Sequence, residues 1–142
     1  MIYSLYGQPG AGKTTLGISL AEYLHTPHFI DGDLFRVMFS NHNFGVSGRK
    51  KNIRALNAVA TYLHSTQSRP VVLAFVNPFE ALRAELKENC RVVEIYLTTK
   101  RKLRTDFHFL EFQIGTPDVW LNTDDTPSVT FKRLALMFPD IR

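Results

Sequence analysis

Apolar residues along this chain fall into short runs separated by longer stretches in which they recur every three or four positions. The short runs are typical of strands buried on both faces, and they occupy residues 2–6, 28–30, 71–76, 92–97 and 119–121. The recurring positions predict amphipathic helices at residues 13–25, 34–39, 49–65 and 79–88, with a last helix after Pro127. Strands that alternate with helices predict an α/β fold, in which right-handed crossovers join parallel strands.

A glycine-rich segment joins the first predicted strand to the first predicted helix. Residues 7–14 read G-x-x-x-x-G-K-T, which is the pattern of a phosphate-binding loop in the strand–loop–helix context that it requires. Backbone N–H groups of such a loop form a nest for anions at the helix N-terminus. Lys13 adds a positive charge for the β- and γ-phosphates, and the Thr14 hydroxyl is placed to bind Mg²⁺. The pattern therefore predicts a nucleoside triphosphate and Mg²⁺ as cofactors, with a nucleotide-binding set of Gly7, Gly10, Ala11, Gly12, Lys13, Thr14 and Thr15.

With this loop, the fold class expected is a three-layer α/β/α P-loop nucleoside triphosphate hydrolase-like fold with a mostly parallel five-stranded sheet. Residues 1–142 are expected to form one kinase domain, because no linker is long enough to divide the chain. No run approaches eighteen apolar residues, so no membrane partner is expected. The single cysteine cannot form an internal disulfide, which fits a reducing compartment, and a cytoplasmic location is expected.

The net charge of +4 comes from 17 Lys and Arg against 13 Asp and Glu, and it suits anionic ligands. The basic residues gather in two separate clusters, at residues 49–54 and 100–104. Two clusters favour two walls of one anionic site over a continuous stripe along a nucleic acid. The partner expected is therefore a small molecule, and nucleic acid is not favoured. The oligomeric state, monomer or homodimer, stays open.

The residues at the ends of the other strands narrow the class of nucleotide-binding protein. The base-reading motif of small GTPases is missing at residues 99–102, and the strand at 71–76 runs into Asn77-Pro78 instead of the Asp that ATPases place on the metal. These absences favour a small-molecule kinase whose carboxylate comes from another strand. Asp33 supplies one, and it lies three residues before Arg36 on one helical face. A cap on the following helix is the alternative role for Asp33, and the pattern leaves both open.

The sequence resembles the adenylylsulfate kinases, which are P-loop enzymes that phosphorylate the 3′-hydroxyl of adenosine 5′-phosphosulfate with ATP. The resemblance is carried by G-x-x-G-A-G-K-T-T at residues 7–15, by D-G-D-x-x-R at residues 31–36, and by Phe44, Arg49 and Asn52 in the order and spacing of the family. The strand that ends in Asn77-Pro78 echoes the family's Ser-Pro-Tyr. The resemblance covers roughly the first 97 residues.

The resemblance implies roles for matching positions. Lys13 and Asp33 would be catalytic, with Asp33 as base or orienter, and Thr14 and Asp33 would hold the metal. Arg36 and Arg49 would bind the phosphosulfate and phosphate oxygens, Phe44 would stack on the adenine, and Asn52 would bind the anionic group. The implied substrate-binding set is Asp33, Arg36, Phe44, Arg49, Asn52, Asn77 and Pro78. A basic flap would add Lys100, Lys102 or Arg104 to the phosphates, and Arg104 is the residue we select.

Two departures from the family bear on the acceptor. Glu80 stands where the family has an arginine, and the lid is reduced to about residues 98–116, where Phe109 or Phe112 would stand for the lid aromatic. The matching Arg83 is not a clear substitute for the lost arginine. These differences leave open a kinase of another hydroxyl compound, such as a nucleoside or sugar acid. A nucleotide-binding module without catalysis and a polynucleotide end kinase are the further alternatives.

Overall fold

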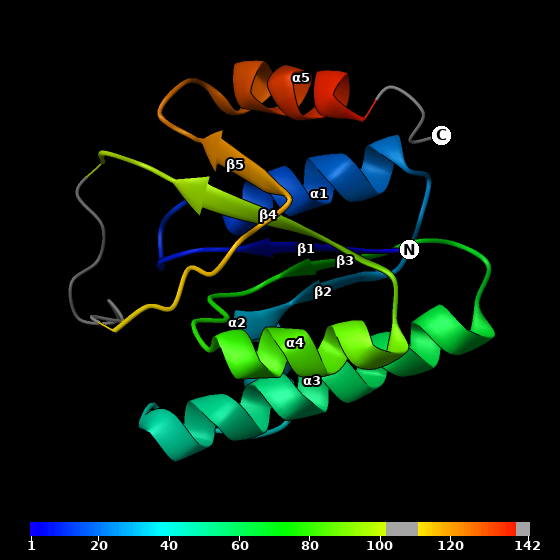
Figure 1. Cartoon of the computed structure of the whole chain (residues 1–142), viewed down its shortest axis with the longest axis vertical. Helices are drawn as coiled ribbons and strands as arrows, with labels where there is room; N and C mark the ends of the chain where they lie inside the picture. Colours follow the sequence, from blue (N-terminus) through cyan, green and yellow to red (C-terminus); the bar gives the residue numbers. More distant parts are fainter. Residues whose placement is uncertain (102–110, 139–142) are drawn as a thin grey trace.

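The computed structural model describes residues 1–101 and 111–138, which form a sheet between two layers of helices (Figure 1). The strands are β1 (Ile2–Tyr6), β2 (Phe29–Asp31), β3 (Val71–Ala74), β4 (Val92–Thr98) and β5 (Val119–Asn122). Their order across the five-stranded sheet is β2-β3-β1-β4-β5, and all neighbouring strands pair in parallel. The α/β class and the three layers predicted from the sequence are confirmed.

Helices cover both faces of the sheet. They are α1 (Lys13–Tyr23), α2 (Gly32–Met38), α3 (Val46–Thr66), α4 (Glu80–Asn89) and α5 (Pro127–Met137). Helices α1 and α5 lie on one face, and α3 and α4 lie on the other (Figure 1). Each face therefore has its own apolar core, which explains why the inner strand β3, between β2 and β1, is buried along its whole length.

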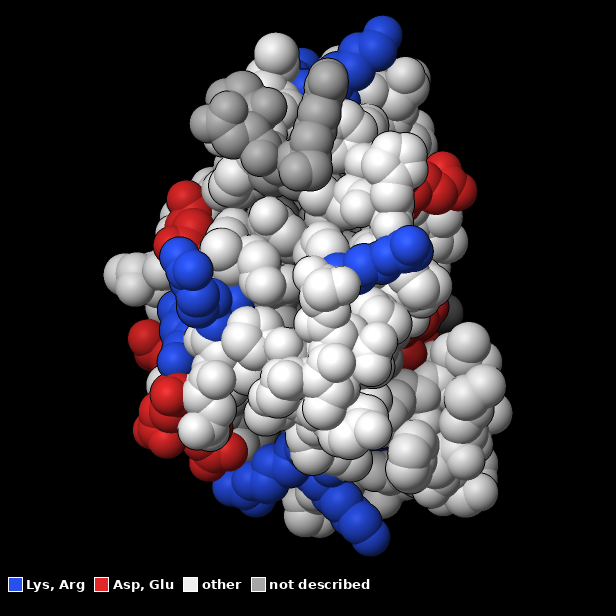
Figure 2. Space-filling view, turned by 90° about the vertical axis from the view of Figure 1, so that its right-hand side faces the viewer, with Lys and Arg blue, Asp and Glu red and all other residues white. Residues whose placement is uncertain are grey.

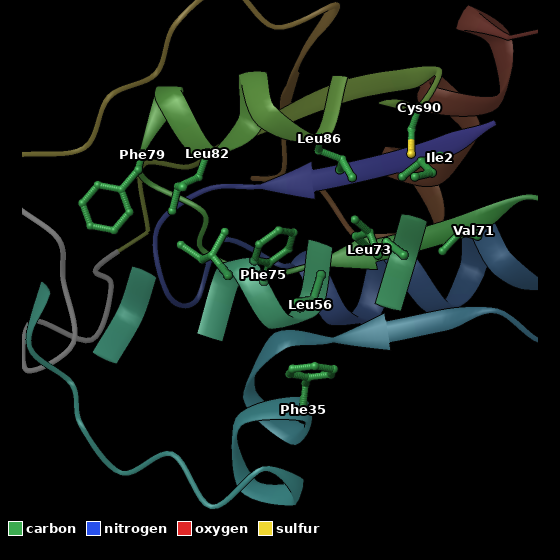
Figure 3. Packing of buried hydrophobic residues seen from close by; sticks show 12 residues of the cluster. Ile2, Phe35, Leu56, Val71, Leu73, Phe75, Phe79, Leu82, Leu86 and Cys90 are labelled. Atoms are coloured by element: carbon green, nitrogen blue, oxygen red, sulfur yellow. The ribbon is translucent and has the colours of Figure 1, made fainter. Parts of the chain in front are cut away.

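The core beneath α3 and α4 shows how the helical periodicity is used. Leu56 of α3 and Leu82 and Leu86 of α4 point toward β3 and β1, where Leu73 and Ile2 meet them (Figure 3). All five side chains are less than 5% exposed. Burying a leucine of this kind contributes about 1.5–3 kcal/mol, so this layer supplies much of the stability of the domain.

The boundary of α3 differs from the sequence prediction. The helix begins at Val46, whereas the pattern of polar residues and glycines predicts a loop up to Gly48. Asn43 explains the difference, because its Oδ1 accepts a hydrogen bond from Gly45 N at 2.9 Å just ahead of the helix. A Cβ on Gly48 would stand 2.0 Å from the Asn43 carbonyl oxygen, so glycine is needed where the loop crosses this first turn. Gly48, which indicates a loop in the sequence, lies inside α3, and glycine is needed there because the preceding loop packs against it.

The carboxyl ends of the strands gather at the left edge of the sheet in Figure 1. Strand β1 leads into the phosphate loop, β2 ends at Asp31, and β3 ends at Ala74. The chain leaves the sheet after Ala74, two residues earlier than predicted, and Asn77 takes a left-handed conformation with φ 50°. In open parallel sheets this edge is where ligands bind.

Candidate functional site

The phosphate loop has the conformation that its glycines permit. Gly10 and Gly12 have φ values of 88° and 95°, in the left-handed region that residues with a Cβ rarely adopt. Gly12 precedes the first turn of α1. Lys13 is 9% exposed, and its Nζ donates to the Gln8 carbonyl oxygen at 2.8 Å, so its ammonium group lies over the loop. The loop thus presents backbone N–H groups and one cation at a helix N-terminus, which is the environment that a triphosphate requires.

Asp31 links β2 to the phosphate loop and was missed in the sequence-based set of site residues. Its Oδ2 accepts a hydrogen bond from the Thr14 hydroxyl at 3.2 Å, and its Oδ1 accepts one from Asp33 N at 2.9 Å. Asp31 is therefore the N-cap of α2. The capping role that the sequence pattern leaves open for Asp33 belongs to Asp31, two residues earlier. The available signal was the position of Asp31 as the last residue of a strand at the carboxyl edge of the sheet.

Between the phosphate loop and α2 lies a cavity of about 520 Å³. The predicted residues that line it are Gly10, Gly12, Lys13, Thr14, Thr15, Asp33, Arg36, Phe44, Arg49, Asn52, Asn77 and Pro78. Gly7 and Ala11, which are buried, do not line it. Arg104, Lys102 and Phe109 lie outside the described residues. Phe112 packs on Tyr6 with a ring-centroid distance of 6.2 Å and does not line the cavity.

Two arginines from different elements form the basic wall of this cavity. Arg36 of α2 donates from Nη1 to the Asn43 carbonyl oxygen at 2.8 Å, and Arg49 of α3 donates from Nε to the Phe44 carbonyl oxygen at 3.0 Å. Burial lowers the pKa of Arg36, and the nearby charge of Arg49 lowers it further, while Asp33 raises it. Burial also lowers the pKa of Arg49. A bound anion would relieve both effects, so this wall favours a phosphate or sulfate group.

Phe44 offers an aromatic surface beside these arginines. The Arg36 guanidinium carbon lies 4.6 Å from the centroid of the Phe44 ring, and the Phe44 side chain is 52% exposed. The guanidinium covers one side of the ring through a cation–π contact. The exposed part of the ring can therefore contact a planar group that enters the cavity.

Two buried asparagines lie at the floor of the cavity. Asn52 Nδ2 donates to the Gly32 carbonyl oxygen at 3.5 Å, which turns its Oδ1 away from that backbone. Among the described residues, neither Asn52 Oδ1 nor Asn77 Oδ1 has a hydrogen-bond partner, and Asn77 is only 2% exposed. A buried acceptor without a donor is costly, by about 1–3 kcal/mol. Both oxygens are therefore suited to accept hydrogen bonds from a ligand's hydroxyl or amine groups.

A buried arginine holds the part of the cavity wall that contains Asn77. Arg83 is 4% exposed, its Nη1 donates to the Asn77 carbonyl oxygen at 2.7 Å, and its Nε lies 3.6 Å from Glu94 Oε2. Its Nη2 donates to the Ile114 carbonyl oxygen at 3.1 Å, and its guanidinium lies over the Tyr6 ring. Arg83 thus holds the loop after β3 and does not line the cavity. The sequence signal for this role was an acidic residue inside the apolar strand β4.

A second, smaller cleft of about 170 Å³ lies on the other side of the phosphate loop. Gly12, Thr15, Arg101, Thr123 and Asp125 are among the residues that line it. Arg101 Nη2 donates to Thr123 Oγ1 at 3.0 Å. The basic cluster at residues 100–104 therefore brings an arginine to the loop, but this arginine is Arg101, which the sequence reasoning did not select.

The opposite face of the molecule, at the amino ends of the strands, has a different character (Figure 2). Lys and Arg side chains lie there in separate groups near Asp and Glu side chains, around a largely uncharged centre. The described residues form no continuous basic stripe across this face. Within the described part of the chain, no helix has the length and apolar character needed to span a membrane.

Comparisons with known proteins relate the chain to kinases. A family model described as adenylylsulphate kinase matches residues 1–107. A probable adenylyl-sulfate kinase from Pyrococcus abyssi is 30% identical over 109 residues, which cover 70% of this chain and 60% of that protein. An adenylate kinase from Streptomyces lividans is 58% identical over 36 residues, 25% of this chain and 18% of that protein. The chain therefore spans less than two thirds of each of these relatives.

A solved structure shares the fold over nearly the whole chain. It is the Mycobacterium tuberculosis APS kinase CysC in complex with AMPPNP and APS, with a TM-score of 0.79 and 18% sequence identity. The match covers 98% of this chain and 97% of that one. At this identity the likeness shows the fold, and the P-loop kinase architecture expected from the sequence is confirmed.

Proposed function

We propose that this chain, which belongs to the adenylylsulphate kinase family, transfers the γ-phosphate of ATP to the 3′-hydroxyl of adenosine 5′-phosphosulfate. One observation carries the proposal: a single cavity has the phosphate loop on one wall and the Arg36–Arg49 pair with Phe44 on the other. Such an arrangement fits a donor that is a triphosphate and an acceptor that is both anionic and aromatic. Adenosine 5′-phosphosulfate has both properties.

In the proposed reaction, the acceptor's 3′-oxygen forms a bond to the γ-phosphorus while the bond from that phosphorus to the β-phosphate oxygen breaks. ADP leaves, and the proton of the hydroxyl passes to the Asp33 carboxylate, which lines the cavity. Phosphoryl transfer depends mainly on positioning and on neutralising charge over the γ-phosphate oxygens. Lys13 and the loop N–H groups supply that neutralisation from the donor wall.

Mg²⁺ fits the residues present at the donor wall. The Thr14 hydroxyl and the Asp31 carboxylate lie together, with Oγ1 and Oδ2 3.2 Å apart, and hard oxygen ligands of this kind suit Mg²⁺. Thr14 would bind the ion directly, and Asp31 and Asp33 would bind it or its water ligands. When bound, the ion would neutralise charge on the β- and γ-phosphate oxygens.

The acceptor wall would hold the rest of the substrate. Arg36 and Arg49 would bind the phosphate and sulfate oxygens, and Phe44 would stack on the adenine. The product, 3′-phosphoadenosine 5′-phosphosulfate, would place the protein in sulfate assimilation, with a cytoplasmic location.

A different hydroxyl acceptor is the second candidate, and Asn77 favours it. The family resemblance expects serine at this position, and the buried Asn77 oxygen, which has no partner among the described residues, favours a ligand that supplies a hydrogen-bond donor. Glu80 contributes less to this alternative than its sequence position indicates, because it does not line the cavity. Its N–H donates to Gln113 Oε1 at 3.0 Å at the start of α4.

The test is ADP release from ATP and Mg²⁺ with a panel of acceptors: adenylylsulfate, a nucleoside, shikimate, gluconate and a single-stranded oligonucleotide. We expect turnover with adenylylsulfate and background rates with the others. Turnover with a sugar acid alone would support the second candidate. Tight ATP binding without any turnover would indicate a nucleotide-binding module, and both results contradict the proposal.

The roles of the two carboxylates that line the cavity, Asp31 and Asp33, can be distinguished in the same assay. Asp33→Asn should lower kcat by about 100-fold or more, because the acceptor hydroxyl loses its base, and it should change the Mg²⁺ requirement less than Asp31→Asn does. Asp31→Asn should instead raise the Mg²⁺ concentration needed for half-maximal activity. Equal Mg²⁺ requirements in both variants would contradict the division of roles between these residues.

A further inference from the structure

The ends of β4 and β5 are joined by one acidic side chain beyond the sheet. Asp124 Oδ1 accepts hydrogen bonds from Thr99 Oγ1 at 2.6 Å and from Lys100 N at 2.9 Å. Its Oδ2 accepts one from Asn122 Nδ2 at 3.0 Å. We name this group of Thr99, Lys100, Asn122 and Asp124 the β4–β5 clasp. It fixes the turn that carries the chain from β4 toward Arg101.

Arg101 connects the clasp to the phosphate loop. Its backbone N–H donates to Thr99 Oγ1 at 3.0 Å, and its guanidinium donates to the carbonyl and hydroxyl oxygens of Thr123. Thr123 Oγ1 in turn donates to the Ala11 carbonyl oxygen at 2.7 Å. A Cβ on Gly12 would stand 3.7 Å from Arg101 Nη2, so the guanidinium lies directly beside the loop.

Arg101 lies next to residues of the phosphate loop, where a positive charge would contact a bound nucleotide. It lines the cleft of about 170 Å³ together with Gly12 and Thr15, which border the bound phosphates in a phosphate loop. An unrestrained arginine side chain loses conformational entropy when it is ordered by a ligand, and this loss weakens binding. A side chain and turn held in place beforehand lose less, so the clasp prepares a cation for the nucleotide.

Asp124 is well suited to hold this turn at all physiological pH values. The hydrogen bond from Thr99, followed by those from Asn122 and the Lys100 N–H, lowers the pKa of Asp124 to about 2. The carboxylate is therefore ionised, and both its oxygens remain acceptors. Its side chain lies on the surface, so its removal leaves the two apolar cores intact.

We propose that Asp124 is a positioning residue for the donor nucleotide, and that it acts by holding the Thr99–Arg101 turn so that the Arg101 guanidinium lies against the phosphate loop. The inference rests on the donor half of the proposed function and is independent of the acceptor. Asp124 itself does not contact the nucleotide. Its effect passes through Arg101.

Isothermal titration of Mg²⁺–ADP into the whole protein tests the proposal. Asp124→Ala and Arg101→Ala should each weaken binding by about tenfold, the size expected for loss of one hydrogen bond to a charged group. Because Asp124 acts through Arg101, the double variant should also be weaker by only about tenfold, instead of the hundredfold of independent effects. Glu88→Ala, on the exposed face of α4, is the control for loss of an acidic residue and should bind like wild type.

A conservative variant separates positioning from general destabilisation. Asp124→Asn keeps an oxygen that can accept from Thr99 and Lys100, so it should retain affinity within about threefold of wild type. Thr99→Val removes the 2.6 Å hydrogen bond to Asp124 and the one that Thr99 Oγ1 accepts from the Arg101 N–H, and it keeps the Asp124 charge. It should weaken binding by about threefold even if Asp124→Ala folds poorly. Melting temperatures of all variants are measured in parallel.

Two results would overturn the inference while leaving the donor half of the proposed function standing. One is wild-type affinity in both Asp124→Ala and Thr99→Val, and the other is an additive, hundredfold loss in the double variant. Failure of the wild-type protein itself to bind Mg²⁺–ADP would overturn the donor half of the proposed function together with this inference.

Discussion

The two walls of the cavity are built in different ways. The donor wall comes from one short segment, residues 9–15, with Lys13 lying over the loop. The acceptor wall is made of side chains from α2, from the loop before α3, from α3 and from the loop after β3. Phosphate binding by backbone N–H groups depends little on side-chain identity. The chemistry of the acceptor wall, in contrast, changes whenever one of its side chains is replaced. The comparison indicates that a fold of this kind can keep one donor while its acceptor varies.

The supports of the two walls differ as well. The phosphate loop is held by the segment that follows β5, where the Thr123 hydroxyl donates to the Ala11 carbonyl oxygen. The acceptor loop is held by the buried Arg83, which is paired with Glu94 and bonded to the Asn77 carbonyl oxygen. Breaking a buried ion pair of this kind costs about 3–5 kcal/mol. The side chains that face the cavity on the acceptor wall can therefore change, while the buried Arg83–Glu94 pair keeps the loop beneath them in place.

The largest effect is expected at the donor wall. Lys13→Met should slow phosphoryl transfer by about 1,000-fold, because charge that develops on the γ-phosphate loses its neutralising cation. Steady-state ADP release measures this loss. Lys51→Met, in an exposed position on α3, is the matched control and should retain wild-type activity. A decrease of less than tenfold in the rate of ADP release by Lys13→Met would contradict a role for Lys13 in phosphoryl transfer.

A smaller and more selective effect is expected at the basic part of the acceptor wall. Arg36→Ala and Arg49→Ala should each raise KM for adenylylsulfate by about 10- to 100-fold, since each loses a hydrogen bond to a charged group. Affinity for Mg²⁺–ADP should stay within about twofold. Arg54→Ala is the control, because Arg54 is an exposed residue of α3 that does not line the cavity and lies 3.9 Å from Glu85 of α4. Equal weakening of ADP and acceptor binding would show that the two walls are not separate.

The smallest effect is expected at Asn77. Glycine accepts the left-handed φ of 50° and lacks the amide, so Asn77→Gly should raise KM for the acceptor by about three- to tenfold with little change in stability. Asn77→Ala should show the same KM and an additional loss of about 1 kcal/mol in the free energy of unfolding, because alanine is strained at this φ. Urea unfolding measures the second effect. An unchanged KM in both variants would exclude the Asn77 amide from acceptor recognition.

Much of the fold follows from the apolar pattern. The strand at residues 2–6 agrees with β1 at both ends, and all five strands and five helices occur in the predicted order. The differences arise at ends of elements, as at α3, where Asn43 and Gly48 pack against each other. Such endings depend on contacts between the loop and the helix, which periodicity does not report.

For the site, the sequence predicts the donor wall, because the phosphate loop is a continuous motif whose backbone carries its own conformation. Family spacing also predicts the residues of the acceptor wall. Three features are visible only in the folded molecule: the Asp31 carboxylate reaches Thr14, Asn77 is buried with an oxygen lacking a partner among the described residues, and Arg101 lies against the loop. The physical reason is that each of these features depends on how separate elements pack together. A pattern along the chain shows which side of an element is buried, whereas the packing of the sheet determines which other element it meets.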